Sequence, residues 1–293
     1  MPNYRNSILC LLTALSLSSG IGAMAEQATA LKGEAVFGRI TKKAKDNNWN
    51  KLPISELMGK IAQELVATPY VASTLELSSS DEICSANLEG LDCVTFFEST
   101  LDLARMIKKG KTKPTDLLAE IRRTRYREGR PGDYSSRLHY TTDWFVDNQE
   151  KGVVKILSDL PGSEDFKQRV GFMSEHPQSY PQLAANAALT NEIKQFEVAI
   201  NKRHLKFVPI AKVAAIEPLL KTGDIVGVCT NIDGLDIVHT GLILRTEDGV
   251  AHFMDASSKK SNMKVTIEPG PISQSIKWSQ NNTGAMFARP LEP

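Results

Sequence analysis

The segment of residues 91–104, LDCVTFFESTLDLA, carries a cysteine in a position that favours reactivity. Asp92 is a residue type preferred at helix N-caps, and apolar residues then recur at helical spacing: Val94, Phe97, Leu101, Ala104 and Ile107. The first turn of a helix stabilises negative charge, so the pattern predicts that Cys93 is a thiolate nucleophile. The alternative is an inert cysteine that packs as a small apolar side chain.

A nucleophilic cysteine needs a base, and the base needs a group that orients it. Three segments, residues 221–230, 236–246 and 250–258, read as consecutive antiparallel strands joined by turns. His239 lies on the second strand and Asp255 on the third. Taken alone, His239 is better interpreted as a partly buried strand residue with a satisfied ring.

Four short motifs occur in a characteristic order: Gly90-Leu91-Asp92-Cys93, Gly223-Asp224-Ile225-Val226, His239-Thr240-Gly241 and Asp255-Ala256-Ser257. They resemble motifs of the NlpC-type clan of papain-like cysteine hydrolases, which act on peptidoglycan. The segments of residues 92–98 and 136–144, DCVTFFE and SRLHYTTDW, are similar to those of the clan's N-acetylmuramoyl-L-alanine amidase-like family. The resemblance spans about residues 54–290.

The resemblance implies a triad of Cys93, His239 and Asp255. The family usually has histidine at the third position, but a carboxylate also holds an imidazole and stabilises its charged form. His252 is a rival orienting group, and it faces the opposite side of the strand from Asp255. A second departure is Ala67, where the family has glycine before the Thr-Pro-Tyr segment.

The predicted substrate-binding residues come from three segments. Tyr70 and the backbone N–H of Cys93 are expected near the oxyanion, and Asp92 precedes the nucleophile. In residues 136–144, Arg137 suits a bidentate carboxylate contact, while His139 and Trp144 could line a groove for a sugar. The alternative for this last segment is a packed junction, because Tyr140 and Trp144 lie at helical spacing.

The predicted function is hydrolysis of the amide between N-acetylmuramic acid and L-Ala, with peptidoglycan as the binding partner. One alternative is the bond between D-Glu and a diamino acid, which other clan members cut. Alternatives of another class are a non-catalytic wall-binding protein and an exported effector.

The N-terminal residues read as a secretory signal peptide, residues 1–25. Arg5 precedes an apolar run too short to span a bilayer, and Ala23-Met24-Ala25 fits a cleavage site. The mature chain is therefore expected in the periplasm or outside the cell, with no membrane span. In an oxidising compartment, Cys84 and Cys229 could pair and leave Cys93 free; the alternative is two separate buried thiols.

Composition excludes several classes of function. The net charge of +1 gives no basic excess for nucleic acid. Neither metal-ligand spacing nor a Gly-rich phosphate loop occurs, so no metal or cofactor is predicted.

Helices precede strands, which favours an α+β, papain-like NlpC-type fold with the cysteine helix on an antiparallel sheet. Residues 26–293 are expected to form one domain, with a helical region at about residues 31–65 and an insertion at about residues 153–205.

Overall fold

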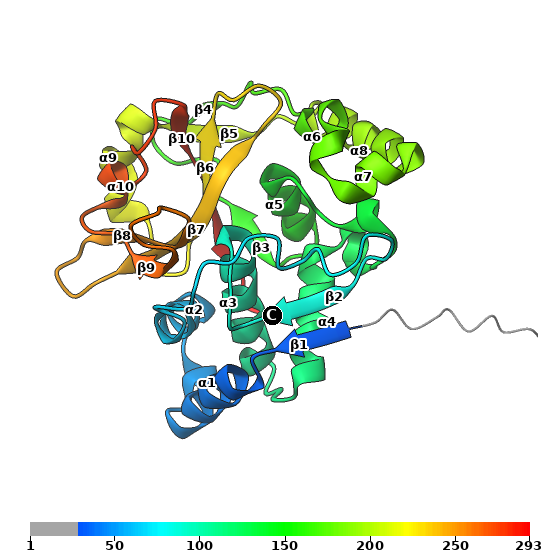
Figure 1. Cartoon of the computed structure of the whole chain (residues 1–293). Helices are drawn as coiled ribbons and strands as arrows, with labels where there is room; N and C mark the ends of the chain where they lie inside the picture. Colours follow the sequence, from blue (N-terminus) through cyan, green and yellow to red (C-terminus); the bar gives the residue numbers. More distant parts are fainter. Residues whose placement is uncertain (1–28) are drawn as a thin grey trace, which may run out of the picture.

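The computed structural model describes residues 29–293, so the predicted signal peptide lies outside the described residues (Figure 1). The strands are β1 (Thr29–Lys32), β2 (Cys84–Asn87), β3 (Val154–Ile156), β4 (Glu164–Asp165), β5 (Lys206–Pro209), β6 (Ile225–Thr230), β7 (Ile237–Arg245), β8 (Ala251–Ser257), β9 (Lys264–Ile267) and β10 (Asn282–Pro290). The helices are α1 (Glu34–Asp46), α2 (Ile54–Glu64), α3 (Cys93–Lys108), α4 (Pro114–Arg125), α5 (Thr141–Glu150), α6 (Phe172–Glu175), α7 (Pro181–Ala185), α8 (Ala187–Ile200), α9 (Val213–Ile216) and α10 (Ile272–Ser275).

The main sheet has the strand order β4-β5-β10-β6-β7-β8-β9, and β3 also pairs with β10. Its pairings are antiparallel. The three strands predicted from the sequence are β6, β7 and β8, adjacent and antiparallel as expected. Gly234 makes the turn before β7 possible: its φ is +74°, and a Cβ there would lie 2.8 Å from the backbone of Phe172. The α+β class with an antiparallel sheet is confirmed.

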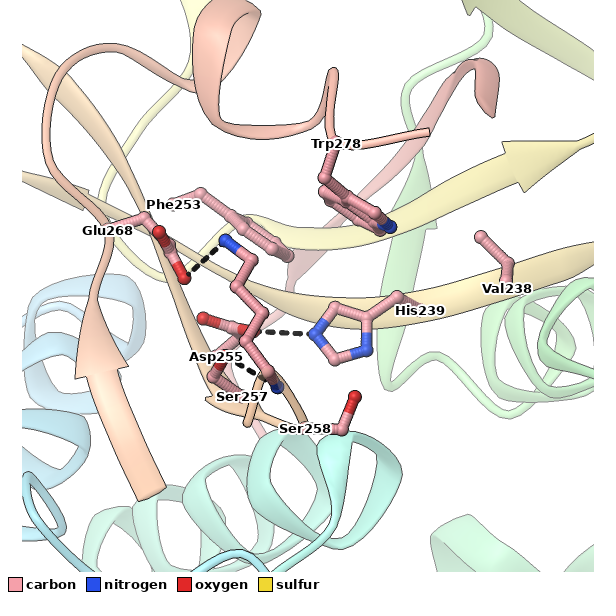
Figure 2. Close-up of a pocket in the computed structure, with 9 residues that line it drawn as sticks. Val238, His239, Phe253, Asp255, Ser257, Ser258, Glu268 and Trp278 are labelled. Atoms are coloured by element: carbon pink, nitrogen blue, oxygen red, sulfur yellow. Dashed lines mark hydrogen bonds and ion pairs between the residues drawn. The ribbon is translucent and has the colours of Figure 1, made fainter. Parts of the chain in front are cut away.

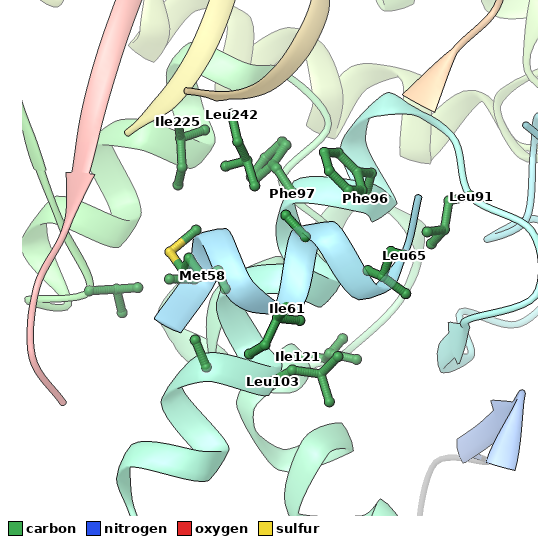
Figure 3. Packing of buried hydrophobic residues seen from close by; sticks show 14 of the residues in the cluster. Met58, Ile61, Leu65, Leu91, Phe96, Phe97, Leu103, Ile121, Ile225 and Leu242 are labelled. Atoms are coloured by element: carbon green, nitrogen blue, oxygen red, sulfur yellow. The ribbon is translucent and has the colours of Figure 1, made fainter. Parts of the chain in front are cut away.

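Helix α3 lies at the centre of the molecule and packs against the sheet. Its apolar face contacts α2 on one side and the strands on another, and Figure 3 shows Phe96 and Phe97 of α3 close to Leu242 of β7 and side chains of α2. Phe97 is 1% exposed and Leu242 is 1% exposed. Each such side chain contributes about 1.5–3 kcal/mol through burial, so the position of the helix relative to the sheet is strongly fixed.

Polar residues on the opposite face of α3 are buried as well. Glu98 accepts hydrogen bonds from Arg125 Nε of α4 at 2.9 Å and from Trp144 Nε1 of α5 at 2.9 Å. Asp102 accepts one from Thr124 at 2.9 Å, and burial together with the charge of Glu98 raises the pKa of Asp102 well above its usual value. Buried polar groups are stable only when paired, so these bonds lock three helices in one register.

A short strand forms within residues 68–92, ahead of the nucleophile. This strand, β2, pairs in parallel with β1, with Thr29 opposite Cys84. The N-terminal strand of the described chain therefore anchors the segment that leads to the nucleophile. Among residues 29–293, no helix has the length and apolarity needed to cross a bilayer.

Of the two alternatives for Cys84 and Cys229, the structure shows separate buried thiols rather than a disulfide. Both are free, fully buried thiols on different strands. The Cys84 sulfur lies 3.9 Å from the carbonyl oxygen of Leu118, and the Cys229 sulfur lies 3.9 Å from that of Gly227. Each cysteine packs as a small side chain in the core.

Candidate active site

Cys93 is the first residue of α3, and its position is set by a capping box. Asp92 is the N-cap: its carboxylate accepts the backbone N–H of Thr95 at 2.8 Å, and the Thr95 hydroxyl accepts the backbone N–H of Asp92 at 2.9 Å. Such a cap stabilises a helix by about 1 kcal/mol. The predicted N-cap is confirmed, and the cysteine lies at the positive end of the helix dipole.

His239 and Asp255 meet across two neighbouring strands. The ring Nε2 of His239 lies 2.6 Å from a carboxylate oxygen of Asp255 (Figure 2). The His239 side chain is 12% exposed and that of Asp255 is 3% exposed. His252, the rival orienting residue, instead places Nδ1 3.1 Å from the Glu268 carbonyl oxygen. Asp255 therefore orients the histidine.

The negative charge of Cys93 acts on the same ring. Because Asp255 occupies Nε2, Nδ1 is the nitrogen left for Cys93. Burial acts to lower the pKa of His239, but the negative charge of Cys93 and the hydrogen bond to Asp255 outweigh it and raise that pKa to about 10. These contacts therefore favour the charged, imidazolium form of His239.

Tyr70 approaches the start of α3 through a short backbone pairing. Tyr70 and Leu91 form a parallel bridge, and the N–H of Val71 donates to the Leu91 carbonyl at 3.0 Å. Burial and the negative charges of Cys93 and Asp92 raise the pKa of Tyr70. The phenol therefore stays protonated at neutral pH and can donate a hydrogen bond near the thiol.

A groove of about 430 Å³ opens in front of these residues. Cys93, His239 and the predicted residues Asp92, Arg137 and His139 line it, together with side chains from α6, α7 and the loop after residue 72. Its size suits a ligand of several rings or residues. No group of three or more His, Cys, Asp or Glu side chains within residues 29–293 is arranged to hold a metal ion.

Comparison with known proteins agrees with this geometry. The sequence profile of the N-acetylmuramoyl-L-alanine amidase-like (AmiA-like) family matches residues 60–277. The chain belongs to this family. A search among curated proteins finds no match.

Solved structures resemble the chain over most of its length. An N-acetylmuramoyl-L-alanine amidase from Bacteroides uniformis is 29% identical, with a TM-score of 0.74 over 81% of this chain and 98% of that one. A protein from Bacteroides fragilis named as a candidate xylanase is also 29% identical, with a TM-score of 0.71 over 80% and 99%. A Legionella pneumophila protein shares the fold at 17% identity, with a TM-score of 0.65 over 88% and 95%.

Two residues predicted to bind substrate have structural partners in this amidase-like chain. Trp144 is 1% exposed and packs edge-on against Phe97 at 5.0 Å between ring centroids. The prediction that it lines the groove is wrong, because its helical spacing reflects core packing. Arg137 does line the groove, but its guanidinium already pairs with Glu76 at 2.6 Å and Glu82 at 3.7 Å. Its contact with a substrate carboxylate stays a prediction.

His139 lies beside Arg137 in the groove wall and is held by its neighbours. Its Nε2 lies 2.8 Å from the carbonyl oxygen of Tyr134, to which it donates, and its ring lies against the Tyr134 ring at 4.4 Å. Burial and the charge of Arg137 hold the pKa of His139 well below its usual value. A neutral ring without a nearby thiol is a poor rival to His239 as the base.

The sequence reasoning missed Trp278, which lies edge-on to His239 at 5.6 Å between ring centroids (Figure 2). It is an isolated tryptophan between α10 and β10, in a segment with no apolar periodicity. Only its residue type could have drawn attention to it.

Proposed function

We propose that this chain is a cysteine-dependent amidase that hydrolyses the bond between N-acetylmuramic acid and L-Ala in bacterial peptidoglycan. The observation that carries the proposal is that Cys93 and His239 line the same groove and that Asp255 bonds to the His239 ring, in a chain of the amidase-like family. The Bacteroides uniformis neighbour, which is named for this reaction, supports the choice of bond.

The reaction follows from the positions of the three side chains. The Cys93 thiolate attacks the amide carbonyl carbon, and the oxyanion is stabilised by the backbone N–H of Cys93 and the Tyr70 hydroxyl. The His239 imidazolium then donates its proton to the leaving nitrogen of L-Ala, the C–N bond breaks and a thioester forms. Water, deprotonated by His239, attacks the thioester, which releases the muramic acid carboxylate and restores the thiolate.

Glycoside hydrolysis is the reaction suggested by the name of the Bacteroides fragilis neighbour, and the groove supports it poorly. That chemistry requires two carboxyl groups facing the bond that is cut. The carboxylates that line the groove are all engaged: Asp92 caps α3, Glu76 binds Arg137 and Gln182, and Asp236 accepts two bonds from Thr142.

Further parts of the proposal concern the clan and the location of the protein. A cysteine at a helix start, packed on an antiparallel sheet that bears the histidine, supports membership of the NlpC-type papain-like clan. The signal-like N-terminus supports export to the periplasm or beyond, with cleavage after Ala25. Peptidoglycan is present there, so the proposed location and the proposed substrate agree.

Mass spectrometry of muropeptide digests tests the reaction. Purified disaccharide-tripeptide is incubated with the mature chain and with Cys93→Ala, and Cys229→Ala serves as a control that removes a buried thiol which does not line the groove. We expect free tripeptide and bare disaccharide from the unmodified chain and from Cys229→Ala only. Disaccharide-dipeptide would identify an endopeptidase, and no product from any variant would contradict hydrolysis and favour a binding role.

A further inference from the structure

A second hollow lies on the other side of His239. This pocket, of about 140 Å³, is shown in Figure 2. It shares Val238 and His239 with the groove, whereas Cys93 lines the groove only. The histidine therefore stands between the nucleophile and this pocket, which we call the Trp278 pocket. Its other lining residues are Phe253, Asp255, Ser257, Ser258, Lys259, Glu268 and Trp278.

An aromatic wall bounds the Trp278 pocket. Trp278 is 41% exposed, although it packs edge-on against His239 with an interplanar angle of 83°. Phe253 is 1% exposed and lies behind the histidine, with its ring centroid 6.0 Å from that of His239. A large indole that remains exposed beside a catalytic base offers apolar surface to a ligand, and tryptophan is well suited to that role.

The charged side chains of the pocket differ in their exposure to solvent. Lys259 Nζ lies 2.9 Å from Glu268 and 5.8 Å from the Trp278 ring centroid. The Lys259 side chain is 42% exposed, but those of Glu268 and Asp255 are only 10% and 3% exposed. Both carboxylates are covered and paired, so a ligand that enters the pocket first meets the ammonium group, which has further N–H donors.

The chemistry of the reaction decides which half of the substrate reaches this pocket. The leaving nitrogen accepts its proton from the His239 nitrogen that faces the groove, so the atoms beyond it pass Val238 and His239, where the groove adjoins the Trp278 pocket. For the proposed amidase these atoms are the stem peptide, which begins with L-Ala and continues with an acidic residue. Two residues of extended chain reach about 7 Å, which exceeds the 5.6 Å between the ring centroids of His239 and Trp278.

We propose that the Trp278 pocket is the subsite for the leaving stem peptide, and that Lys259 binds the free carboxylate of its acidic second residue. This inference rests on the proposed amidase function. It assigns substrate selection to a loop outside the catalytic triad. Peptides whose second residue is amidated should be poor substrates, because they lack the negative charge that the ammonium binds.

The test compares two substrates that differ in one group. Disaccharide-tripeptides with either D-Glu or D-isoglutamine as the second residue are incubated with the unmodified chain, Lys259→Met and Lys260→Met. Lys260 is the exposed neighbour and undergoes the same loss of charge. We expect the unmodified chain and Lys260→Met to prefer the free acid by about tenfold in kcat/KM. Lys259→Met should lower kcat/KM for the free acid to the value for the amide.

The outcomes separate this inference from the function on which it rests. Cleavage of both substrates at equal rates by the unmodified chain would overturn the carboxylate subsite alone. A preference that persists in Lys259→Met would also overturn it, because another group would then bind the carboxylate. Cleavage of neither substrate would overturn the proposed amidase and this inference with it.

Discussion

Replacement of Asp255 by asparagine tests how the catalytic histidine is controlled. The pKa of His239, about 10, lies about 3.5 pH units above the ordinary value of 6.5, which corresponds to about 5 kcal/mol in favour of the imidazolium. The charge of Cys93 and the hydrogen bond to Asp255 share this effect against the opposing effect of burial. Asp255→Asn removes the carboxylate charge and weakens the hydrogen bond, so the pKa of His239 should fall.

The direction of the pH effect follows from the raised pKa. The imidazolium, which donates the proton to the leaving nitrogen, is present below the raised pKa and is lost as pH rises through about 10. Activity should therefore fall at the alkaline end near pH 10 in the unmodified chain and at a lower pH in Asp255→Asn. Loss of ring orientation should also reduce kcat by about 10²–10⁴-fold.

The assay is a pH profile of kcat/KM on disaccharide-tripeptide, measured for both chains. Asp159→Asn is the control, because this exposed aspartate lies in the loop after β3, away from the groove. It should leave both the profile and kcat unchanged. An alkaline limit that does not move in Asp255→Asn, or a kcat within a factor of about three of the unmodified chain, would refute the role assigned to the carboxylate.

Three further results are expected. Iodoacetamide should label Cys93 at neutral pH faster than the two fully buried cysteines, as measured by peptide mapping; equal rates in folded protein would contradict an activated thiol. Glu98→Ala should lower the free energy of unfolding by about 3–5 kcal/mol in a denaturant titration, because Arg125 would remain buried without its partner. Gly241→Ala should lower the free energy of unfolding by about 1–3 kcal/mol, because a Cβ there would lie 2.5 Å from a carbonyl oxygen of the next strand. Gly38→Ala, with open space around it in α1, should raise the free energy of unfolding by about 0.5–1 kcal/mol. Equal effects of the two changes in the same titration would contradict the packing of β7 on β8.

Local chemistry made part of the molecule predictable from sequence. Helix α3 has its N-cap residue and its apolar periodicity within one short segment, so its start at Cys93 could be predicted without a structure. The strands β6, β7 and β8 follow one another through short turns, which fixed their antiparallel pairing. The order of the motifs was specific enough to indicate the amidase-like family.

Other features depend on contacts between residues far apart in the chain. From the sequence, Trp144 could be either a groove residue or a core residue. The structure places it in the core, where its Nε1 donates a hydrogen bond to the buried Glu98 carboxylate, 46 positions earlier in the chain. Arg137 was correctly placed beside the site, but its pairing with Glu76 depends on a loop whose path local pattern does not determine.

The proposed mechanism depends both on local sequence patterns and on contacts between residues far apart in the chain. Capping and periodicity act over a few positions, so local sequence was enough to place the start of the helix and the residues of the strands. The contact of Asp255 with His239, which the family resemblance implied, and the position of Trp278 beside the same ring are visible only in the folded chain. Those contacts depend on strand register and on the path of a long connection, which are set by the packing of the whole domain.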